Sequence, residues 1–484
     1  LPGLALPITV LYLEAQMKAM SILFISIFAL ATYGFAEPLE ERIKFLEEEI
    51  KKQQESLQTQ QKMLEELKEQ NKQVKTTAEQ PQRGQATGRG YRLDDRSRGI
   101  YAQTAFPVTP YELMKHPLPN LLNPAISLIL DTFYYHSSLS QNELESRSSP
   151  GFRKSLDPDR PGFNLRSAEM RIFAPVDPYF NLYATIPFTE KGGTLEEAYF
   201  VTTALPAGFQ IKGGKFRSGF GRLNAFHPHM WDFVDPALPY KLFLGLEGLI
   251  EKGVQLTYLP SLPFYALFGI EILQGDNEIL FGPEAQSGPH AYTGFAKACL
   301  DFGEDHTILF GFSVTGGKTK TASFEKGTDE KKGTEFLGDS ILYDGELTYK
   351  WKPANKHSFI LQTEYLYLNQ KGDLTDLGAS TTNSLQRFQD GCYIQALYQV
   401  ERWRIGGRYD LMGLFKDELI RAGQNINFPG RPSRWTGSLE FNPTEFSRIR
   451  LQYNYDQGGR EGKENHEVFL QFILAVGSHR AHPF

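Results

Sequence analysis

The 484-residue sequence contains only two cysteines, Cys299 and Cys392, too few for a fold held together by disulfides. By strand alternation, Cys299 shares a face with Lys297, whereas Cys392 shares a face with Ile394. The two thiols therefore point to opposite sides of any sheet that contains both. We expect no disulfide between them.

Long apolar runs and an excess of basic residues are also missing. The formal net charge is -6, so no strongly basic surface indicates binding to nucleic acid. The mean hydropathy of -0.38 is too polar for a bundle of membrane helices. One strongly apolar run occurs, at residues 20–31, and it is shorter than the roughly 20 residues that a membrane helix requires.

That apolar run has the features of a secretory signal. It follows Met17 and Lys18, and small residues at Gly34 and Ala36 precede Glu37. We therefore expect residues 1–36 to comprise an upstream extension and a signal peptide, with translation starting at Met17 and cleavage after Ala36. A short membrane anchor is the alternative reading.

Residues 37–75 follow an unbroken 4-3 spacing of apolar and seam residues, which predicts an α-helical coiled coil of about five heptads in the periplasm. The predicted a positions are Ile43, Ile50, Leu57, Leu64 and Asn71. The predicted d positions are Leu39, Leu46, Gln53, Gln60, Leu67 and Val74. A lone solvated helix is the alternative. Residues 76–124 are rich in Gln, Gly, Arg, Thr and Pro, a composition that predicts a linker.

From residue 125 onward the sequence alternates between apolar and polar residues, as in "RIRLQYNYDQ" at 448–457. This period of two predicts strands with one apolar face. The 44 glycines, 23 tyrosines and 36 phenylalanines suit such strands. Sixteen strands are predicted, near residues 125–136, 163–174, 179–188, 195–203, 208–216, 252–259, 264–274, 291–302, 306–315, 340–352, 357–369, 390–400, 403–413, 434–442, 446–456 and 466–477.

The connections between these strands alternate in length. Short segments such as "LPAG", "PANK" and "NPTE" occupy every second junction, and the other junctions are mostly long. One rim with short turns and one rim with long loops are typical of a bacterial outer-membrane barrel. The apolar faces of such a barrel meet lipid, and its charged faces surround water. The predicted fold is all-β: residues 125–484 form a 16-stranded antiparallel transmembrane β-barrel, preceded by the coiled coil. A soluble β-sandwich or a secreted β-solenoid is the alternative.

The layout of residues 125–484 resembles the trimeric outer-membrane porins of Gram-negative bacteria. A coiled coil ahead of the barrel is similar to the phosphate-selective porins. The stretches "GKFRSGFGRLNAFHPHMWDFVD" (214–235), "GVQLTYLP" (253–260), "IEILQGDN" (270–277) and "GSHRAHPF" (477–484) resemble a group of porins described as zinc-regulated. These resemblances imply location in the outer membrane, contact with its lipid, assembly into a homotrimer and passive diffusion of small hydrophilic or charged solutes.

The porin resemblance also implies that the third external loop, residues 217–251, folds inward and narrows the pore. Asp232, Asp235 and Glu247 are its candidate constriction residues. We expect an arginine sector of the wall to oppose these carboxylates, and an acidic sector to lie elsewhere. The candidate pore-lining residues are Arg404, Arg408, Arg448, Arg450, Asp344, Glu346, Glu364, Glu271 and Asp301. Alternatively, the arginines pair with Asp410, Glu440 or Asp456 and stiffen the wall.

His227 and His229 in "HPH" are candidate metal ligands. Zinc needs about four ligands, and two loop histidines supply at most two, so two solvent-facing histidines are the favoured reading. No catalytic constellation stands out, and we expect neither a cofactor nor an enzyme. A second candidate function is an envelope tether, in which the coiled coil binds peptidoglycan or a partner and the barrel is an anchor.

Overall fold

The computed structural model describes residues 124–147, 159–282, 288–322, 333–353, 356–426, 430–459 and 463–477. The chain divides into two units, Leu1–Arg92 and Leu93–Phe484, and all described residues belong to the second. The expected signal peptide, coiled coil and linker lie outside the described residues and stay predictions.

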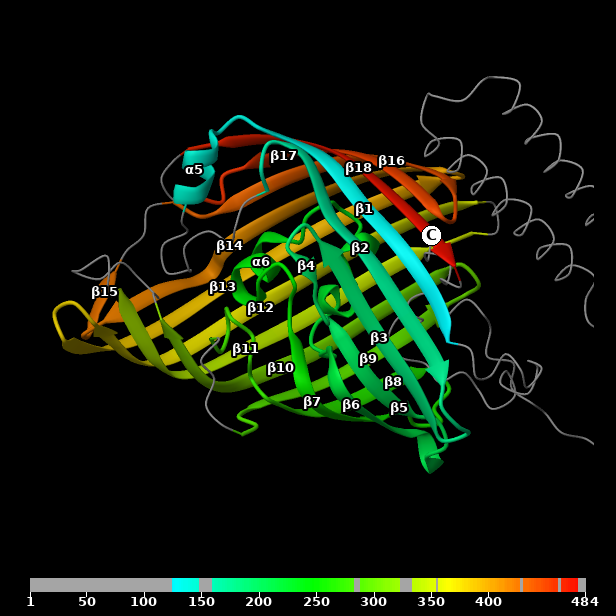
Figure 1. The fold of residues 1–484 in the computed structure, drawn as a ribbon, viewed down its shortest axis with the longest axis horizontal. Helices are drawn as coiled ribbons and strands as arrows, with labels where there is room; N and C mark the ends of the chain where they lie inside the picture. The colour runs from blue at the N-terminus through cyan, green and yellow to red at the C-terminus, as the bar shows by residue number, and fades with distance from the viewer. Residues whose placement is uncertain are drawn as a thin grey trace, which may run out of the picture. The chain divides into compact units, whose positions relative to one another are not determined.

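The described residues form one closed antiparallel sheet (Figure 1). Its strands are β1 (Ala125–Ser137), β2 (Gly162–Pro175), β3 (Phe180–Thr189), β4 (Gly192–Gly193), β5 (Glu197–Thr202), β6 (Phe209–Arg217), β7 (Ile250–Tyr258), β8 (Tyr265–Leu273), β9 (Ala291–Phe302), β10 (His306–Ala322), β11 (Thr334–Trp351), β12 (His357–Asp376), β13 (Thr381–Val400), β14 (Trp403–Arg421), β15 (Gln424–Ile426), β16 (Ser433–Thr444), β17 (Ser447–Asp456) and β18 (Asn465–Gly477).

Two of these 18 strands, β4 and β15, are short pieces within connections, and the other 16 make the wall. Each wall strand pairs with its neighbour in sequence, and β1 pairs with β18 from Ser127↔Gly477 to Ser137↔Glu467. The predicted 16-stranded antiparallel barrel is thereby confirmed. Closure leaves no unpaired edge, which hydrocarbon would penalise by several kcal/mol per backbone group.

Helical structure among the described residues is confined to connections. The helices are α5 (Gln141–Ser146), α6 (Leu238–Leu244) and three 3₁₀ turns, η2 (Pro206–Gly208), η3 (Leu223–Ala225) and η4 (Pro228–Met230). No helix in the part of the chain that the structure describes has both the length and the apolar character required to cross a bilayer.

Side chains alternate between the two faces of the barrel wall as the period of two predicts. On β17, Leu451 and Tyr453 are exposed on the outside, whereas Arg450 and Gln452 are fully buried inside. Large apolar side chains cover the outside of other strands too. They include Ile270, Phe312, Leu347, Ile394, Ile405, Trp435, Leu474 and Val476. An apolar outer face around a charged interior is the arrangement of an outer-membrane barrel.

The two cysteines obey the same alternation. Cys299 is buried on the inner face of β9, and Cys392 is half-buried on the outward parity of β13. Their side chains therefore lie on opposite faces of the sheet, as predicted, and the described residues contain no disulfide between them.

The rim predicted to carry long loops has a different structure at β10–β14. Long loops were expected there, but these strands run for 17–20 residues and protrude on one side of the barrel (Figure 1). β12 and β13 are joined by only residues 377–380. Phe336, Leu374, Leu385 and Leu419 form a buried cluster within the protruding part. A small apolar core therefore stabilises hairpins where sequence alternation is too weak to distinguish strand from loop.

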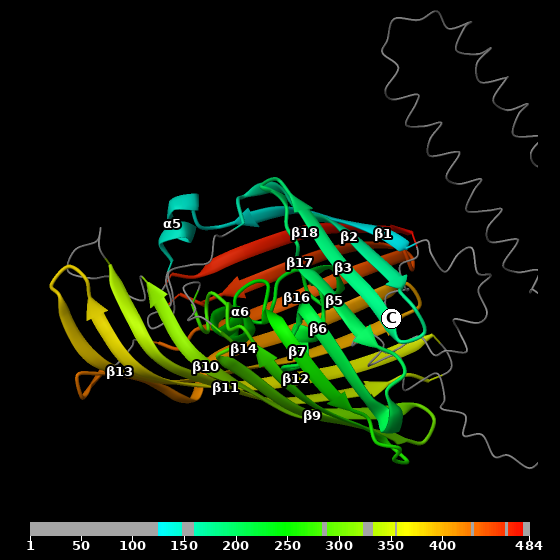
Figure 2. The same ribbon diagram turned by 60° about the horizontal axis from the view of Figure 1, so that its bottom comes forward.

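The connection between β6 and β7, residues 218–249, enters the barrel. We call it loop 3. Its helix α6 lies inside the ring of strands in both views (Figures 1 and 2) and packs against β12, β13 and β14. Loop side chains such as Phe220, Trp231 and Phe243 join inward leucines of the wall, including Leu342 and Leu366, in the largest buried cluster. Burial of these aromatic groups offsets the cost of ordering the loop.

The assignment of the outward face to lipid predicts that a charge placed there destabilises the barrel. Ile270→Arg on β8 places a charge where a 62% exposed isoleucine meets lipid, and we expect it to lower the free energy of unfolding in lipid vesicles by about 2–4 kcal/mol. The matched control is Leu337→Arg on the protruding part of β11, between Lys320 and Asp373 of the neighbouring strands. This change should cost little, because its surroundings are already charged. Equal losses at both sites, measured by urea titration, would contradict the assignment of the lipid-facing surface.

Candidate functional site: loop 3 and the inner wall

Loop 3 crosses the lumen without regular strand structure because its sequence interrupts extended backbone repeatedly. Pro228 begins η4 and Pro239 is the second residue of α6. Gly221, Gly245 and Gly248 adopt positive φ angles. The segment can therefore bend to follow the inner wall. Its polar atoms meet two charged sectors of that wall.

The first anchor is the acidic sector. Glu271 of β8 accepts the Gly219 N–H at 2.8 Å, and Glu364 of β12 accepts the N–H groups of Arg222 at 2.5 Å and Leu223 at 3.2 Å. Both carboxylates are buried. The backbone N–H groups stabilise the buried negative charge of these carboxylates, and the same hydrogen bonds hold the loop against the wall.

Gly221 makes this close approach possible. Its φ is +59°, and a Cβ atom there would lie 2.8 Å from Glu364 Oε1. Its carbonyl oxygen accepts a hydrogen bond from Lys297 Nζ at 2.5 Å. Lys297 also pairs with Glu346 at 3.2 Å, beside the buried Asp344. The predicted acidic residues Asp344, Glu346 and Glu364 thus form one cluster, with ligand-type oxygens within 4.8 Å of one another.

The second anchor is the arginine sector. Asp232 pairs with Arg404 at 2.5 Å, and Asp235 pairs with Arg408 at 3.2 Å and with Arg434 at 2.5 Å. The remaining predicted arginines bind the backbone of loop 3. Arg448 Nη1 donates to the His229 carbonyl at 3.2 Å and Arg450 Nη2 to the Trp231 carbonyl at 2.9 Å.

The arginines also pair within the wall. Arg450 Nη2 lies 2.6 Å from Glu440 Oε2, and Arg434 Nη2 lies 2.8 Å from Asp410 Oδ2. The arginines and the loop carboxylates, which we expected on opposite sides of a constriction, are in direct contact in the structure. The alternative of pairing with Glu440 also holds. Spacing along the chain cannot reveal this, because it does not say how far loop 3 reaches.

Two predicted site residues lie away from both anchors. Asp301 is exposed at the end of β9 and accepts a hydrogen bond from Thr307 Oγ1 at 2.7 Å. Glu247 is also exposed, and its backbone oxygen rather than its carboxylate accepts from Arg217 at 2.8 Å. Pore-lining or constriction roles for these two residues stay predictions.

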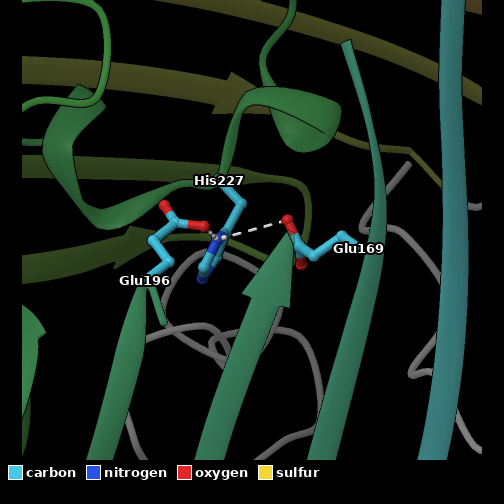
Figure 3. A group of neighbouring side chains, drawn as sticks. All are labelled: Glu169, Glu196 and His227. Carbon is cyan, nitrogen blue, oxygen red and sulfur yellow. Dashed lines mark ion pairs between the residues drawn. The ribbon is translucent and has the colours of Figure 1, made fainter. Parts of the chain in front are cut away.

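The two loop histidines are buried, so the expectation that they face solvent is wrong. His227 Nε2 lies 2.9 Å from Glu197 Oε2, and its Nδ1 lies 3.6 Å from carboxylate oxygens of both Glu169 and Glu196 (Figure 3). His229 Nδ1 lies 3.3 Å from the same Glu169 oxygen. Loop 3 carries its histidines into a carboxylate group supplied by β2 and the start of β5.

Charge governs the state of this cluster. Burial by itself would lower the pKa of His227, but Glu169 and Glu196 outweigh it and raise the pKa to about 9. Burial would raise the pKa of Glu196, but Arg217 and His227 outweigh that effect and lower it. Burial lowers the pKa of His229 despite the nearby Glu169. The cluster therefore strongly favours positive charge at His227.

A cavity of about 420 Å³ lies between loop 3 and the wall. Glu169, Glu196 and His229 are among its lining residues, together with Trp231 and Asp235 of the loop. Further charged lining groups of both signs come from several elements: Asp159, Arg166, Lys241, Arg434, Asp456 and Glu467. The cavity is thus a polar space inside the barrel, bounded on one side by the anchored loop.

Several residues that organise this site escaped the sequence reasoning. Glu169, Glu196 and Glu197 supply the histidine cluster, and Arg217 and Arg434 hold the loop. Glu169, Glu197 and Arg434 have the inward parity of their strands, and Glu196 stands just before β5, so parity marks these four as interior. Arg217 ends β6 on the opposite parity to the buried Phe216, so parity could not have found it. Only the strand register places Glu197 beside Thr185 and Glu169 beside Pro187, near the loop.

Comparison with known proteins places this chain in a family. No protein-family model matches it. A protein of Aquifex aeolicus (strain VF5), described as uncharacterized, is 43% identical over 383 residues, which cover 75% of this chain and 80% of that protein. The chain belongs to the same family as this Aquifex protein.

The chain is also similar to solved outer-membrane proteins. OmpT of Vibrio cholerae, in a trimer form, is 12% identical with a TM-score of 0.45. The match covers 73% of this chain and 99% of the OmpT chain. The outer membrane channel DcaP of Acinetobacter baumannii is 11% identical with a TM-score of 0.44, over 73% of this chain and 96% of that chain. An anion-selective porin from Comamonas acidovorans is 9% identical with a TM-score of 0.43, over 73% and 99%.

Asp235 makes the second anchor dependent on pH. Burial would raise its pKa, but Arg434 and Arg408 outweigh burial and lower it from 3.8 to about 2. Since the pKa in the folded protein is below the unfolded value, the stabilisation is present above about pH 4 and is lost as the pH falls through about 2. The difference corresponds to about 2 kcal/mol.

We therefore expect cleavage of loop 3 by pepsin in the folded barrel to increase as the pH falls from 4 towards 2. Asp235→Asn is the matched control, because it removes the titrating group and should show a weaker pH dependence in this range. Identical pH profiles for the two proteins would contradict the role of Asp235 in anchoring the loop.

Proposed function

We propose that this protein is an outer-membrane channel through which small hydrophilic or charged solutes diffuse passively. The observation that carries the proposal is the position of loop 3, which is held inside a closed lipid-facing barrel by ionic contacts on two walls and leaves a charged cavity of about 420 Å³ beside it. A barrel of 16 strands is wide enough for an aqueous bore. In this proposal, no side chain performs covalent chemistry.

The charges of the cavity support small polar solutes in particular. Arg166, Lys241 and Arg434 line it together with Asp456 and Glu467. Mixed charges in a confined space of low dielectric orient water and polar solutes and exclude large apolar ones. The arginines of the second anchor act mainly by positioning loop 3, since Arg408 and Arg450 are buried against it.

Self-association, with a homotrimer as the proposed form, is supported by one short stretch of the wall. β5 has six residues, whereas a strand that crosses a membrane needs about 9–11. Six residues rise only about 20 Å, less than the roughly 30 Å hydrocarbon layer. A second copy packed against this stretch would cover backbone that lipid would otherwise meet.

The channel proposal is tested in planar bilayers. Purified protein should produce stable ion-conducting steps, and neutral sugars up to a limiting size should reduce the current. The double change Asp232→Ala and Asp235→Ala removes the loop carboxylates that pair with Arg404, Arg408 and Arg434. Only backbone contacts, such as that of Arg434 with the Pro236 carbonyl, then hold this part of loop 3 to the arginine sector. We expect higher conductance and greater current noise because loop 3 leaves the wall.

Asp373→Ala is the control for that experiment, because Asp373 is exposed on the protruding part of β12. It should leave the current steps unchanged. Folded protein that inserts into the bilayer but carries no current would refute the channel. A double variant that conducts like the control would refute the role of loop 3 in the constriction.

Self-association is tested by the mass of the protein in mild detergent, corrected for bound detergent. We expect three copies, and Phe200→Lys on the outer face of β5 should release monomers because it places a charge in the covered stretch. Phe415→Lys is the control on the outer face of β14, where the side chain is 75% exposed. A monomeric native protein, or dissociation by both variants alike, would contradict this interface.

A further inference from the structure

We propose that Glu169, Glu196 and His227 form a binding site for a divalent transition-metal ion such as Zn²⁺, which fastens loop 3 to β2 and to the start of β5. These three residues come from three separate segments and are all buried (Figure 3). Imidazole nitrogen and carboxylate oxygen are ligands that Zn²⁺ accepts. The site does not depend on whether the barrel conducts.

The distances within the cluster suit a metal ion better than direct hydrogen bonds. His227 Nδ1 lies 3.6 Å from Glu169 Oε2 and 3.6 Å from Glu196 Oε2, which is too long for a good hydrogen bond. Bonds of about 2.1 Å to a tetrahedral ion set its ligand atoms roughly 3.4 Å apart. An ion placed among the three ligand atoms would need only small side-chain shifts. His227 Nδ1 makes no hydrogen bond within the described residues.

The other ring nitrogen of His227 is held in the way that metal-binding histidines usually are. Nε2 lies 2.9 Å from Glu197 Oε2, where its N–H can donate, and Glu197 Oε1 accepts the backbone N–H of Arg217 at 2.8 Å. A metal ion replaces the proton on Nδ1 of the positively charged ring, and the lone pair that this leaves, with Nε2–H still donated to Glu197, faces Glu169 and Glu196. Carboxylates in this orienting position support metal-bound histidines.

The charges leave room for a cation. Among the described residues, the three buried carboxylates Glu169, Glu196 and Glu197 face two buried cations, Arg217, which pairs with Glu196, and Lys212, which lies near Glu197. Arg171 reaches Glu169 only at 3.9 Å and is one third exposed. A proton on His227 or a divalent ion supplies the missing positive charge.

The site is also accessible, and further ligands are close. Glu169 and Glu196 line the cavity beside loop 3, so an ion can reach them from the water inside the barrel. His229 lines the same cavity, with its Nδ1 3.3 Å from Glu169 Oε2. Either His229 or water from the cavity can complete four ligands, which the two histidines could not supply by themselves.

The test is metal binding by the full-length protein in detergent after treatment with a chelator. Titration calorimetry with Zn²⁺ should show one site per chain, and Co²⁺ should give the visible absorption of a tetrahedral complex. His227→Gln and Glu169→Gln should each weaken binding at least about tenfold, and Glu197→Gln should weaken it by about 10- to 100-fold through loss of the orienting hydrogen bond. His306→Gln is the control, because His306 is exposed at the β9–β10 turn.

Folding of every variant is checked by circular dichroism and by its heat-dependent mobility in gels. Native protein that binds neither Zn²⁺ nor Co²⁺ would overturn the proposal, as would unchanged affinity in folded His227→Gln and Glu169→Gln. If one variant fails to fold, the other two decide the question by the same criterion. The titration does not depend on conductance, so the two proposals fail separately. Metal binding by a protein that carries no current in bilayers would refute the channel alone. Current through a protein that binds no metal would refute the metal site alone.

Discussion

Everything in this structure depends on satisfying backbone hydrogen bonds in hydrocarbon. Sixteen strands pair with their sequence neighbours, and the β1–β18 ladder removes the last edge. Once the sheet is closed, alternation of side chains gives every strand a lipid-facing side and an enclosed side. The interior therefore collects the charged residues of many strands within one bore, and their mutual pairing becomes the second determinant of the structure.

Loop 3 supplies partners for many of these interior charges. Its backbone N–H groups satisfy Glu271 and Glu364 on one wall, its aspartates satisfy Arg404, Arg408 and Arg434 on another, and its histidines enter the carboxylates of β2 and β5. Its aromatic residues fill the space between these contacts. A buried charge left without a partner costs several kcal/mol, so the loop and the wall stabilise each other. The cavity beside the loop is the space that this arrangement leaves to water and solutes.

The parts of the fold that could be predicted are those that follow local rules. "RIRLQYNYDQ" identifies β17 because its period of two records burial on one face only, and the Pro, Gly and Asn segments identify one rim because they are turn formers. Prediction failed where local rules are silent. The protruding β12–β13 hairpin depends on contacts of Leu374 and Leu385 with Phe336 and Leu419 from other strands. The burial of His227 and His229 depends on where loop 3 ends its path.

By itself, the sequence determined that the barrel has 16 strands and that Cys299 and Cys392 lie on opposite faces, because alternation and turn formers along the chain mark each strand and its two faces. Only the tertiary structure decided which interior charges touch. Asp235 is 199 residues from Arg434, and His227 is 58 residues from Glu169, so only strand register, barrel closure and the path of loop 3 bring them together. Coulomb interactions and desolvation depend on distance in space, and alternation along a strand carries no information about that distance.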